Sequence, residues 1–93
     1  MKEETFLNKR VAEIVELSGR QVLSWTEKGL VVPFRETVGV GKKRLYDAVN
    51  LLEFALAKIL LEAGIGWRQT KNIVLELRRG DVIRAWKTDF LGY

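Results

Sequence analysis

Apolar residues in the first part of the chain recur every three or four positions, which is the period of an α-helix. Between residues 9 and 15 they form one stripe, made of Val11, Ile14 and Val15. Asn8, directly before this stripe, is a residue type that caps helix N-termini with its side chain. The pattern therefore predicts a short helix over residues 9–15 with Asn8 as its N-cap.

The second helix has the clearest start signal in the sequence. Ser18 and Gln21 have the spacing of a capping box, in which each side chain bonds the backbone N–H of the other residue. Gly29 can adopt the left-handed backbone conformation that ends helices, so we expect this helix over residues 19–28. Two short helices separated by so few residues predict a helix-turn-helix.

After Gly29 the pattern changes to two short apolar runs that are typical of strands. Residues 30–32 and residues 44–46 are these runs, and a loop rich in glycine and lysine connects them over residues 37–43. We therefore expect a β-hairpin with a basic tip.

Two longer helices follow the hairpin. Asp47 is the expected cap of a helix over residues 48–63, and a further helix is expected over residues 67–79. The apolar side chains that we expect in the core from these helices are Leu52, Leu56, Ile59, Ala63, Trp67, Ile73, Val74 and Leu77. Phe54 and Leu61 fall on another side, where the last helix, the C-terminal segment or a partner subunit is expected to cover them.

The order helix, helix, hairpin, helix, helix predicts a mainly α fold with a small β-hairpin, which is a winged helix-turn-helix. A chain of 93 residues without internal repeats fits one domain, which we place at residues 1–80. Residues 81–93 form a short C-terminal segment, whose apolar spacing favours a helix over a strand. This segment is a candidate start of a dimerisation helix.

Composition removes several classes of function. The chain has no cysteine and no histidine, which excludes disulfides, thiolate nucleophiles, imidazole bases and most zinc or copper sites. No two carboxylates have the spacing of a shared catalytic site, so we expect neither an enzyme nor a cofactor. The longest apolar stretch, residues 48–66, is interrupted by charges, and the N-terminus lacks a signal-peptide core. We therefore expect no membrane association and a cytoplasmic, nucleoid-associated protein.

Positive charge gathers in the expected hairpin. The chain has a net charge of +4, and the cations of the hairpin are Arg35, Lys42, Lys43 and Arg44. Such a basic wing can straddle a DNA backbone or enter a minor groove. A solvated loop that protects a sheet edge has the same composition and is the alternative interpretation.

The helix over residues 19–28 offers a second candidate surface for DNA. A helical wheel turns Val22 and Trp25 inward and leaves Arg20, Leu23 and Ser24 on the outward side. Arg20 can make two hydrogen bonds to a guanine, and Leu23 can touch a thymine methyl group. An ordinary solvated helix face is the alternative for these residues.

The first turn of the same helix adds three further candidates for DNA contact. The free backbone amides near Ser18 and Gly19 lie at the positive end of the helix dipole, where a phosphate binds favourably. Gln21 can face DNA as well, but its role in the capping box would occupy it with the backbone.

Residues 11–30, followed by Pro33 and the Lys-Arg-Leu-Tyr sequence of residues 43–46, resemble the winged-helix domain of the MerR family of bacterial transcription regulators. The resemblance spans about residues 6–77. Its strongest part is Trp25 four positions before a Gly-Leu pair, followed by the proline and an Arg-x-Tyr strand.

The resemblance implies sequence-specific binding to double-stranded DNA. In that family the helix that corresponds to Arg20 and Gln21 enters the major groove, and the wing arginine that corresponds to Arg44 contacts the backbone. Full-length members are usually dimers that bind palindromic promoter spacers, and a C-terminal domain senses an effector. The effector cannot be identified from this chain, and a homodimer is a possible assembly.

Three positions depart from the usual family pattern. Leu23 stands where a basic residue is common, Ser24 where a tyrosine is common, and Glu16 where a turn glycine is common. We therefore expect fewer phosphate contacts from this helix. The segment after Gly80 is too short for the long dimerisation helix of such regulators. Two alternatives follow: the chain is part of a longer regulator with an effector region, or it is a minimal regulator.

Two other functions are compatible with the same pattern. An excisionase-like architectural protein would bend DNA in a recombination complex instead of controlling a promoter. A winged-helix adaptor would bind another protein through apolar side chains, for which the candidates are Leu23, Phe54, Leu61 and Trp86.

Overall fold

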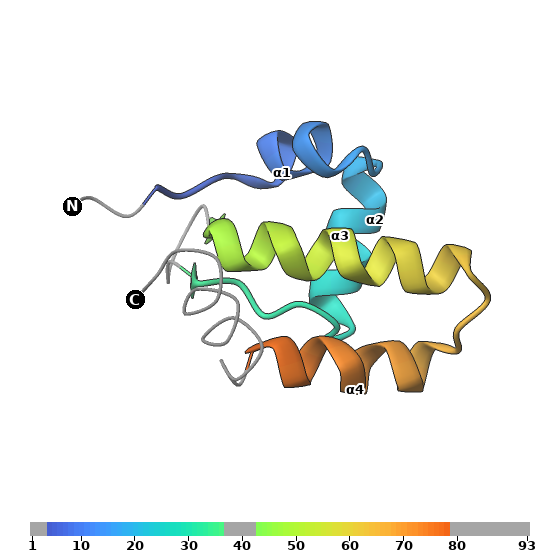
Figure 1. The fold of residues 1–93 in the computed structure, drawn as a ribbon. Helices are drawn as coiled ribbons and strands as arrows, with labels where there is room; N and C mark the ends of the chain where they lie inside the picture. Colours follow the sequence, from blue (N-terminus) through green and yellow to red (C-terminus); the bar gives the residue numbers. More distant parts are fainter. Residues whose placement is uncertain (1–3, 37–42, 79–93) are drawn as a thin grey trace, which may run out of the picture.

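The computed structural model describes residues 4–36 and 43–78 of the chain (Figure 1). The elements in chain order are α1 (Asn8–Val15), α2 (Gly19–Glu27), β1 (Arg35–Glu36), β2 (Arg44–Leu45), α3 (Ala48–Glu62) and α4 (Trp67–Arg78). The expected winged helix-turn-helix is therefore confirmed. Within the described ranges, no helix has the length and apolar character needed to cross a membrane. The expected helix after Gly80 lies outside the described residues.

α3 is the central helix of the fold. In Figure 1, α1 and α4 lie on opposite sides of α3, and α2 passes behind it. α4 returns antiparallel along α3, while α1 packs against both α2 and α3. Since one face of α2 packs toward α3, its other face points away from the core.

Four aromatic rings join the helices in the core. Trp25 of α2 stacks on Phe54 of α3 with ring centroids 6.3 Å apart, and it meets Trp67 of α4 edge-on at 6.3 Å. Tyr46 meets Phe54 edge-on at 5.5 Å. The inward direction expected for Trp25 is confirmed. The other buried apolar residues of this core are Val11, Val15, Val22, Leu30, Val31, Ala57 and Val74.

The polar caps predicted for α2 and α3 are present. The Ser18 hydroxyl accepts from the Gln21 N–H, and the Gln21 Oε1 accepts from the Ser18 N–H, both at 3.0 Å. Asp47 and Asn50 form a second capping box at the start of α3. Gly29 has a φ of 77° and follows α2, as expected for a residue that ends a helix in the left-handed conformation.

The cap predicted for α1 is wrong. Asn8 is the first residue of the helix, Leu7 occupies the N-cap position without a side-chain hydrogen bond, and the Asn8 Oδ1 has no partner among the described residues. The preceding residue explains the difference. Phe6 pairs with Tyr46 through two backbone hydrogen bonds of 2.7 and 2.8 Å, which holds the chain extended up to Leu7.

The first strand lies later than predicted, because residues 30–32 form no strand. Leu30 and Val31 are both buried, and both of their N–H groups donate to the Trp25 carbonyl, at 2.9 and 3.4 Å. Neighbouring residues of a strand point to opposite faces, so a run that buries two neighbours fits the exit of a helix better. β1 instead pairs with β2 antiparallel, with Arg35 opposite Leu45.

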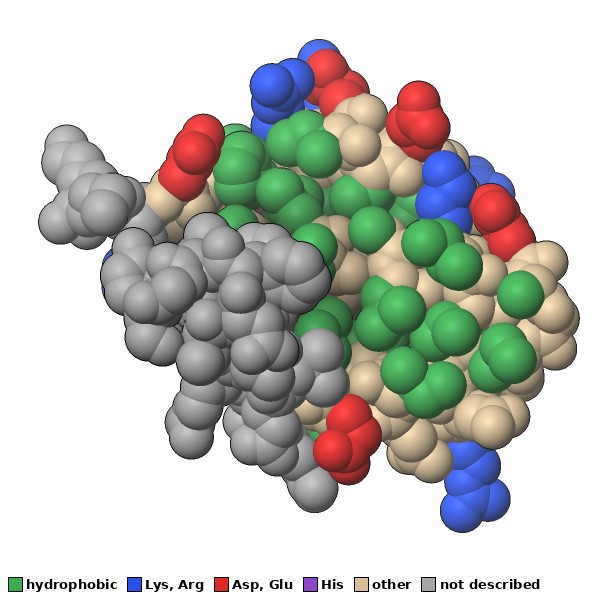
Figure 2. Space-filling view, in the orientation of Figure 1, with side chains coloured by type: hydrophobic (Ala, Val, Ile, Leu, Met, Phe, Trp, Pro, Cys, Tyr) green, Lys and Arg blue, Asp and Glu red, His purple; other side chains and the backbone are tan. Residues whose placement is uncertain are grey.

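The apolar stripe predicted as the core side of α3 is only partly correct, because Leu56 packs half-buried against the core whereas the other three positions are exposed. Leu52 and Ile59 are 54% and 63% exposed, whereas Phe54 and Ala57 are fully buried. Figure 2 shows hydrophobic side chains gathered over the face of α3 that is in view. α3 is apolar on two sides, and the rings of Trp25 and Tyr46 select the side with Phe54. In α4, Val74 is buried as predicted, but Ile73 is 36% exposed.

Candidate nucleic-acid interface

The outward side of α2 carries the predicted base-reading residues. Arg20 is exposed in the first turn, together with Ser18 and Gly19. Leu23 is 39% exposed one turn later, and Ser24 is half-buried. The side of α2 that the helical wheel leaves outward is therefore accessible in the structure.

The capping box limits what Gln21 can contribute. Its Oε1 accepts from the Ser18 N–H, so the acceptor of this side chain is already engaged with the backbone. The N–H groups of Gly19 and Arg20 come before the first intrahelical bond, which the Val22 N–H donates to the Ser18 carbonyl at 3.1 Å. The start of α2 therefore offers free amides and an exposed arginine at the positive end of the helix dipole.

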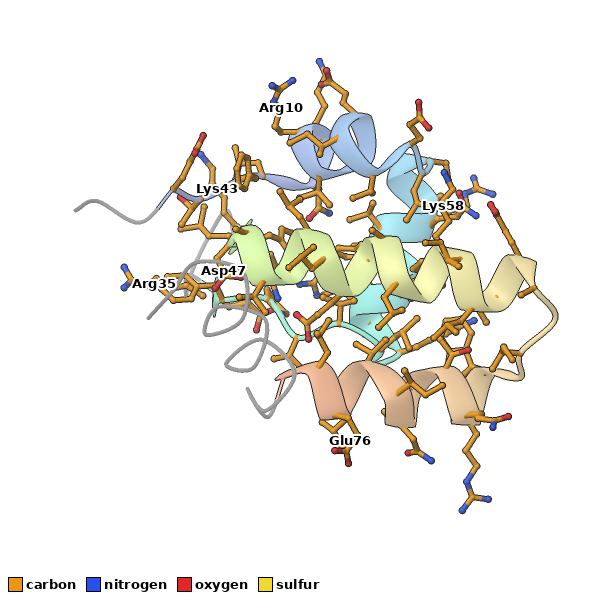
Figure 3. All side chains as sticks on the ribbon, viewed as in Figure 1. Arg10, Arg35, Lys43, Asp47, Lys58 and Glu76 are labelled. Carbon is orange, nitrogen blue, oxygen red and sulfur yellow. The ribbon has the colours of Figure 1, made fainter. Side chains whose placement is uncertain are left out.

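The wing consists of β1, β2 and the adjoining Lys43. Arg35 and Lys43 are exposed and lie at the same end of the molecule in Figure 3. Arg44 is half-buried, and its Nε donates to the Glu36 Oε1 at 2.8 Å across the antiparallel pair. This hydrogen bond raises the pKa of Arg44 above its ordinary value. Lys42, also predicted for the wing, lies outside the described residues.

A buried hydrogen bond connects the wing to α2. Thr26 donates its hydroxyl hydrogen to the Val22 carbonyl at 2.9 Å, so the Tyr46 hydroxyl, 2.8 Å away, donates to Thr26. Tyr46 is completely buried, and desolvation raises the pKa of its hydroxyl. Because Tyr46 directly follows β2, this bond fixes the base of the wing relative to the last turn of α2.

Asn50 holds the other arm of the wing. Its Nδ2 donates to the Val32 carbonyl at 2.8 Å and to the Glu53 Oε1 at 2.7 Å. Its Oδ1 accepts from the N–H groups of Phe34 and Asp47, at 2.9 and 3.0 Å. All hydrogen-bonding positions of this buried amide are used. The segment that enters β1 is thereby fixed to the start of α3.

The outward side of α2 and the wing meet at a surface hollow of about 390 Å³. The residues that line it come from α1 and its approach, from α2 and from the wing: Leu7, Asn8, Lys9, Leu23, Glu36, Lys43 and Arg44. Three of the predicted DNA-binding residues, Leu23, Lys43 and Arg44, therefore share one surface. Arg20 and Arg35 lie outside this lining, and the Arg35 guanidinium lies 5.6 Å from the centre of the Phe34 ring.

Residues 9–77 of the chain match the family described as MerR HTH family regulatory protein. The match covers both helices of the helix-turn-helix, the wing, α3 and nearly all of α4. The chain belongs to the MerR family.

Three similar curated proteins are each described as an uncharacterized HTH-type transcriptional regulator. One comes from Mycobacterium bovis and two come from strains of Mycobacterium tuberculosis. Each is 34% identical to this chain over 71 residues, which is 75% of the chain. The chain spans 32% of the length of these relatives.

The MerR-type turn between α1 and α2 contains a backbone conformation that glycine adopts more easily. Glu16 has φ 56° and ψ 48°, which is the left-handed region. Lys58 of α3 stabilises this turn, because its Nζ donates to the carbonyls of Val15 and Glu16 at 3.3 and 3.1 Å. The departure from glycine at this position therefore carries backbone strain but leaves the turn intact.

Sequence reasoning missed two features of this candidate surface. Lys9 and Leu7 reach the hollow only because the Phe6–Tyr46 pairing brings the N-terminal segment beside the wing. The Glu36–Arg44 pair depends on the hairpin register, which the 37–43 loop did not reveal. Within residues 4–36 and 43–78, no three side chains of His, Cys, Asp or Glu gather in a group able to hold a metal ion.

Proposed function

We propose that this MerR-family chain binds double-stranded DNA in a sequence-specific manner and regulates transcription. In this proposal α2 enters a major groove while the wing follows the adjacent backbone or minor groove. The observation that carries the proposal is the shared hollow, which Leu23 of α2 lines together with Lys43 and Arg44 of the wing. Two groups on one surface can reach a single duplex together.

The buried contacts behind this surface support the same function. A recognition helix reads bases only if phosphate contacts fix its register on the duplex. The Tyr46–Thr26 bond joins the wing to α2 at 2.8 Å, so the two cannot move independently without breaking a buried hydrogen bond. A wing that grips the backbone would thereby orient α2 in the groove.

The proposed residue roles follow from position and chemistry. Arg20 reads a guanine, Leu23 contacts a thymine methyl group, and Ser24 and Gln21 face the groove edge. The free amides of Gly19 and Arg20, next to Ser18 at the start of α2, hold a phosphate. The backbone contacts of the wing come from Arg35, Lys42, Lys43 and Arg44. Residues 1–80 form this DNA-binding domain, and two copies on one palindromic site are the proposed assembly.

Selection of bound fragments from a random DNA pool tests the proposal. The wild-type chain should enrich a defined sequence, and Arg20→Ala should relax preference at one position, at a cost of about 1–3 kcal/mol. Arg44→Ala should weaken binding to all sequences alike. Arg68→Ala, an exposed arginine of α4, is the matched control. An unchanged base preference in Arg20→Ala would contradict the role of this residue.

A protein-binding adaptor is the second candidate, because Leu52 and Ile59 leave an apolar stripe exposed on α3. Salt-titrated DNA binding separates the two functions. A regulator that contacts several phosphates should lose affinity steeply as salt rises, whereas an adaptor should have no DNA affinity to lose. Absence of DNA binding at low salt would favour the adaptor and overturn the proposed function.

A further inference from the structure

The hollow between α1, α2 and the wing combines two kinds of surface. Two exposed leucines, Leu7 and Leu23, contribute apolar area. Three cations and one carboxylate, Glu36, contribute a positive net charge. The roles proposed above use Leu23 and the wing cations but leave Leu7 and Lys9 without a function.

A DNA strand presents the matching combination. Its backbone alternates an anionic phosphate with an apolar deoxyribose, and proteins direct half or more of their DNA hydrogen bonds to phosphate and sugar. Residues of α2 and of the wing both line the hollow, so in the proposed binding mode it faces the backbone between the two grooves that they enter. Lys9 and Lys43 reach it from two different parts of the chain, and Arg44 adds a guanidinium suited to phosphate.

A free small molecule fits the hollow less well than a strand. Pockets for small ligands bury most of the ligand surface. Here Leu7, Lys9, Glu36 and Lys43 are all exposed, so the lining is open to solvent. An open, cationic and partly apolar surface suits a polymer that lies across it.

We propose that this hollow seats one phosphodiester of the bound DNA and that Lys9 is one of its phosphate ligands. The inference rests on the proposed function and adds a contact from α1 to those of α2 and the wing. Arg44 contributes through the guanidinium nitrogens that its Nε bond to Glu36 leaves available. Leu7 and Leu23 pack against the adjoining sugar.

Arg10 provides a matched control on the same helix. It follows Lys9 directly and is also exposed, but it does not line the hollow, and its Nη1 lies 3.7 Å from the Glu13 Oε2. Among the described residues, Lys9 has no ion-pair partner. A general effect of positive charge would involve both residues equally, whereas a seated phosphate would involve Lys9 alone.

The test compares Lys9→Gln with Arg10→Gln in salt-titrated binding to a duplex selected from a random pool. Lys9→Gln should lower affinity several-fold and reduce the slope of log K against log salt by about 0.9, which is the value of one phosphate contact. Arg10→Gln should leave the slope unchanged. Equal effects of both variants, or none from Lys9→Gln, would overturn the inference.

A neutral methylphosphonate placed at each linkage of the duplex in turn locates the contact. At one linkage the substitution should weaken the wild-type protein but cause no further loss in Lys9→Gln. Additive losses at every linkage would show that Lys9 touches no single phosphate, which contradicts the inference.

Two further measurements distinguish failure of this inference from failure of the proposed function. Inorganic phosphate alone, titrated against the DNA-free protein, should bind only weakly, and tight binding would replace the DNA strand with a free anion as the occupant. If Lys9→Gln changes nothing while Arg20→Ala and Arg44→Ala weaken binding, this inference fails and the proposed function stands. If the wild-type protein binds no DNA, the proposed function fails first.

Discussion

Asn50, near the start of α3, contacts the wing from its buried side, whereas Arg44 belongs to the wing itself and lies on its solvent side. The two residues differ in burial and in the number of their hydrogen bonds. Asn50 is fully buried, and its amide makes four hydrogen bonds. Arg44 is half-buried, and one hydrogen bond to an exposed carboxylate is described for it. Water can replace the bond of Arg44 but not those of Asn50. The shape of the wing therefore depends on buried, hydrogen-bonded groups, while its charge is available for exchange with a ligand.

The same contrast extends to two sets of residues. The buried anchor consists of Asn50, Glu53, Tyr46 and Thr26, which are each less than 9% exposed. The cationic rim consists of Lys9, Arg20, Arg35, Lys43 and Arg44. Changes in the anchor should lower the free energy of unfolding, whereas changes in the rim should leave it nearly constant and alter DNA binding.

Asn50→Ala should produce the largest loss of stability. It removes four hydrogen bonds and leaves the buried Glu53 without one of its partners, for an expected cost of about 3–4 kcal/mol in the free energy of unfolding. Chemical denaturation measures this change. Asn72→Ala, at an exposed position of α4, is the control and should stay within about 0.5 kcal/mol of wild type. A similar small effect for Asn50→Ala would show that the anchor does not hold the wing.

Tyr46→Phe should cost less, because it removes a single bond. Thr26 keeps its own bond to the Val22 carbonyl, so the expected loss is about 1 kcal/mol. A cycle with Thr26→Val measures the coupling between the two hydroxyls. Additive losses in the double variant would mean that the hydroxyls do not interact.

The pH dependence provides a second measurement on Tyr46. Burial raises its pKa above the ordinary value of 10.0, so the folded state retains a proton that the unfolded state releases. Stability from this group is complete below pH 10 and falls as pH rises from there through the folded pKa. Tyr46→Phe should lack this decline. An equal decline in both proteins above pH 10 would contradict the assignment.

The anchor and the rim also differ in how far the sequence predicts them. The capping box of Ser18 and Gln21 lies within four residues, so its pattern was enough to place α2. The inner side of α3 depends on which rings pack against it, and the equally apolar stripe with Leu52 was indistinguishable from the one with Phe54. The role of Asn50 in the wing was unrecognised for the same reason, because its two hydrogen bonds to the arm before β1 go to residues 16 and 18 positions away.

The rim was predicted more completely than the anchor. Arg20 and Arg44 could be predicted because a cation at the start of a helix and a cation in a basic hairpin are both recognisable from the neighbouring residues in the sequence. Lys9 does not, since it approaches the wing only through the pairing of Phe6 with Tyr46. These two partners are 40 residues apart, and the local periodicity of the sequence does not predict a contact over that separation.

Glu16→Gly tests whether the turn before α2 stores strain. Glu16 is in the left-handed region, where a side chain costs about 1 kcal/mol, so glycine should stabilise the protein by up to about that amount. Both hydrogen bonds of the turn to Lys58 use backbone carbonyls and are kept. Glu13→Gly, inside α1, should instead destabilise by about 1 kcal/mol. Thermal unfolding should give the two variants opposite signs, and a common sign would refute the strain.

Glu36→Gln should have the smallest effect on stability. It therefore distinguishes most directly between an effect on DNA binding, expected for the rim, and an effect on stability, expected for the anchor. An exposed ion pair contributes about 0–1 kcal/mol, so the free energy of unfolding should change little. DNA affinity should rise for two reasons. The substitution removes a negative charge from the hollow, and the Arg44 guanidinium is no longer neutralised by an adjacent carboxylate. Glu62→Gln, at the far end of α3, should not reproduce the gain. Weaker binding in Glu36→Gln would instead mean that this carboxylate orients Arg44 toward the phosphate, and the rim would then need a fixed geometry as the anchor does.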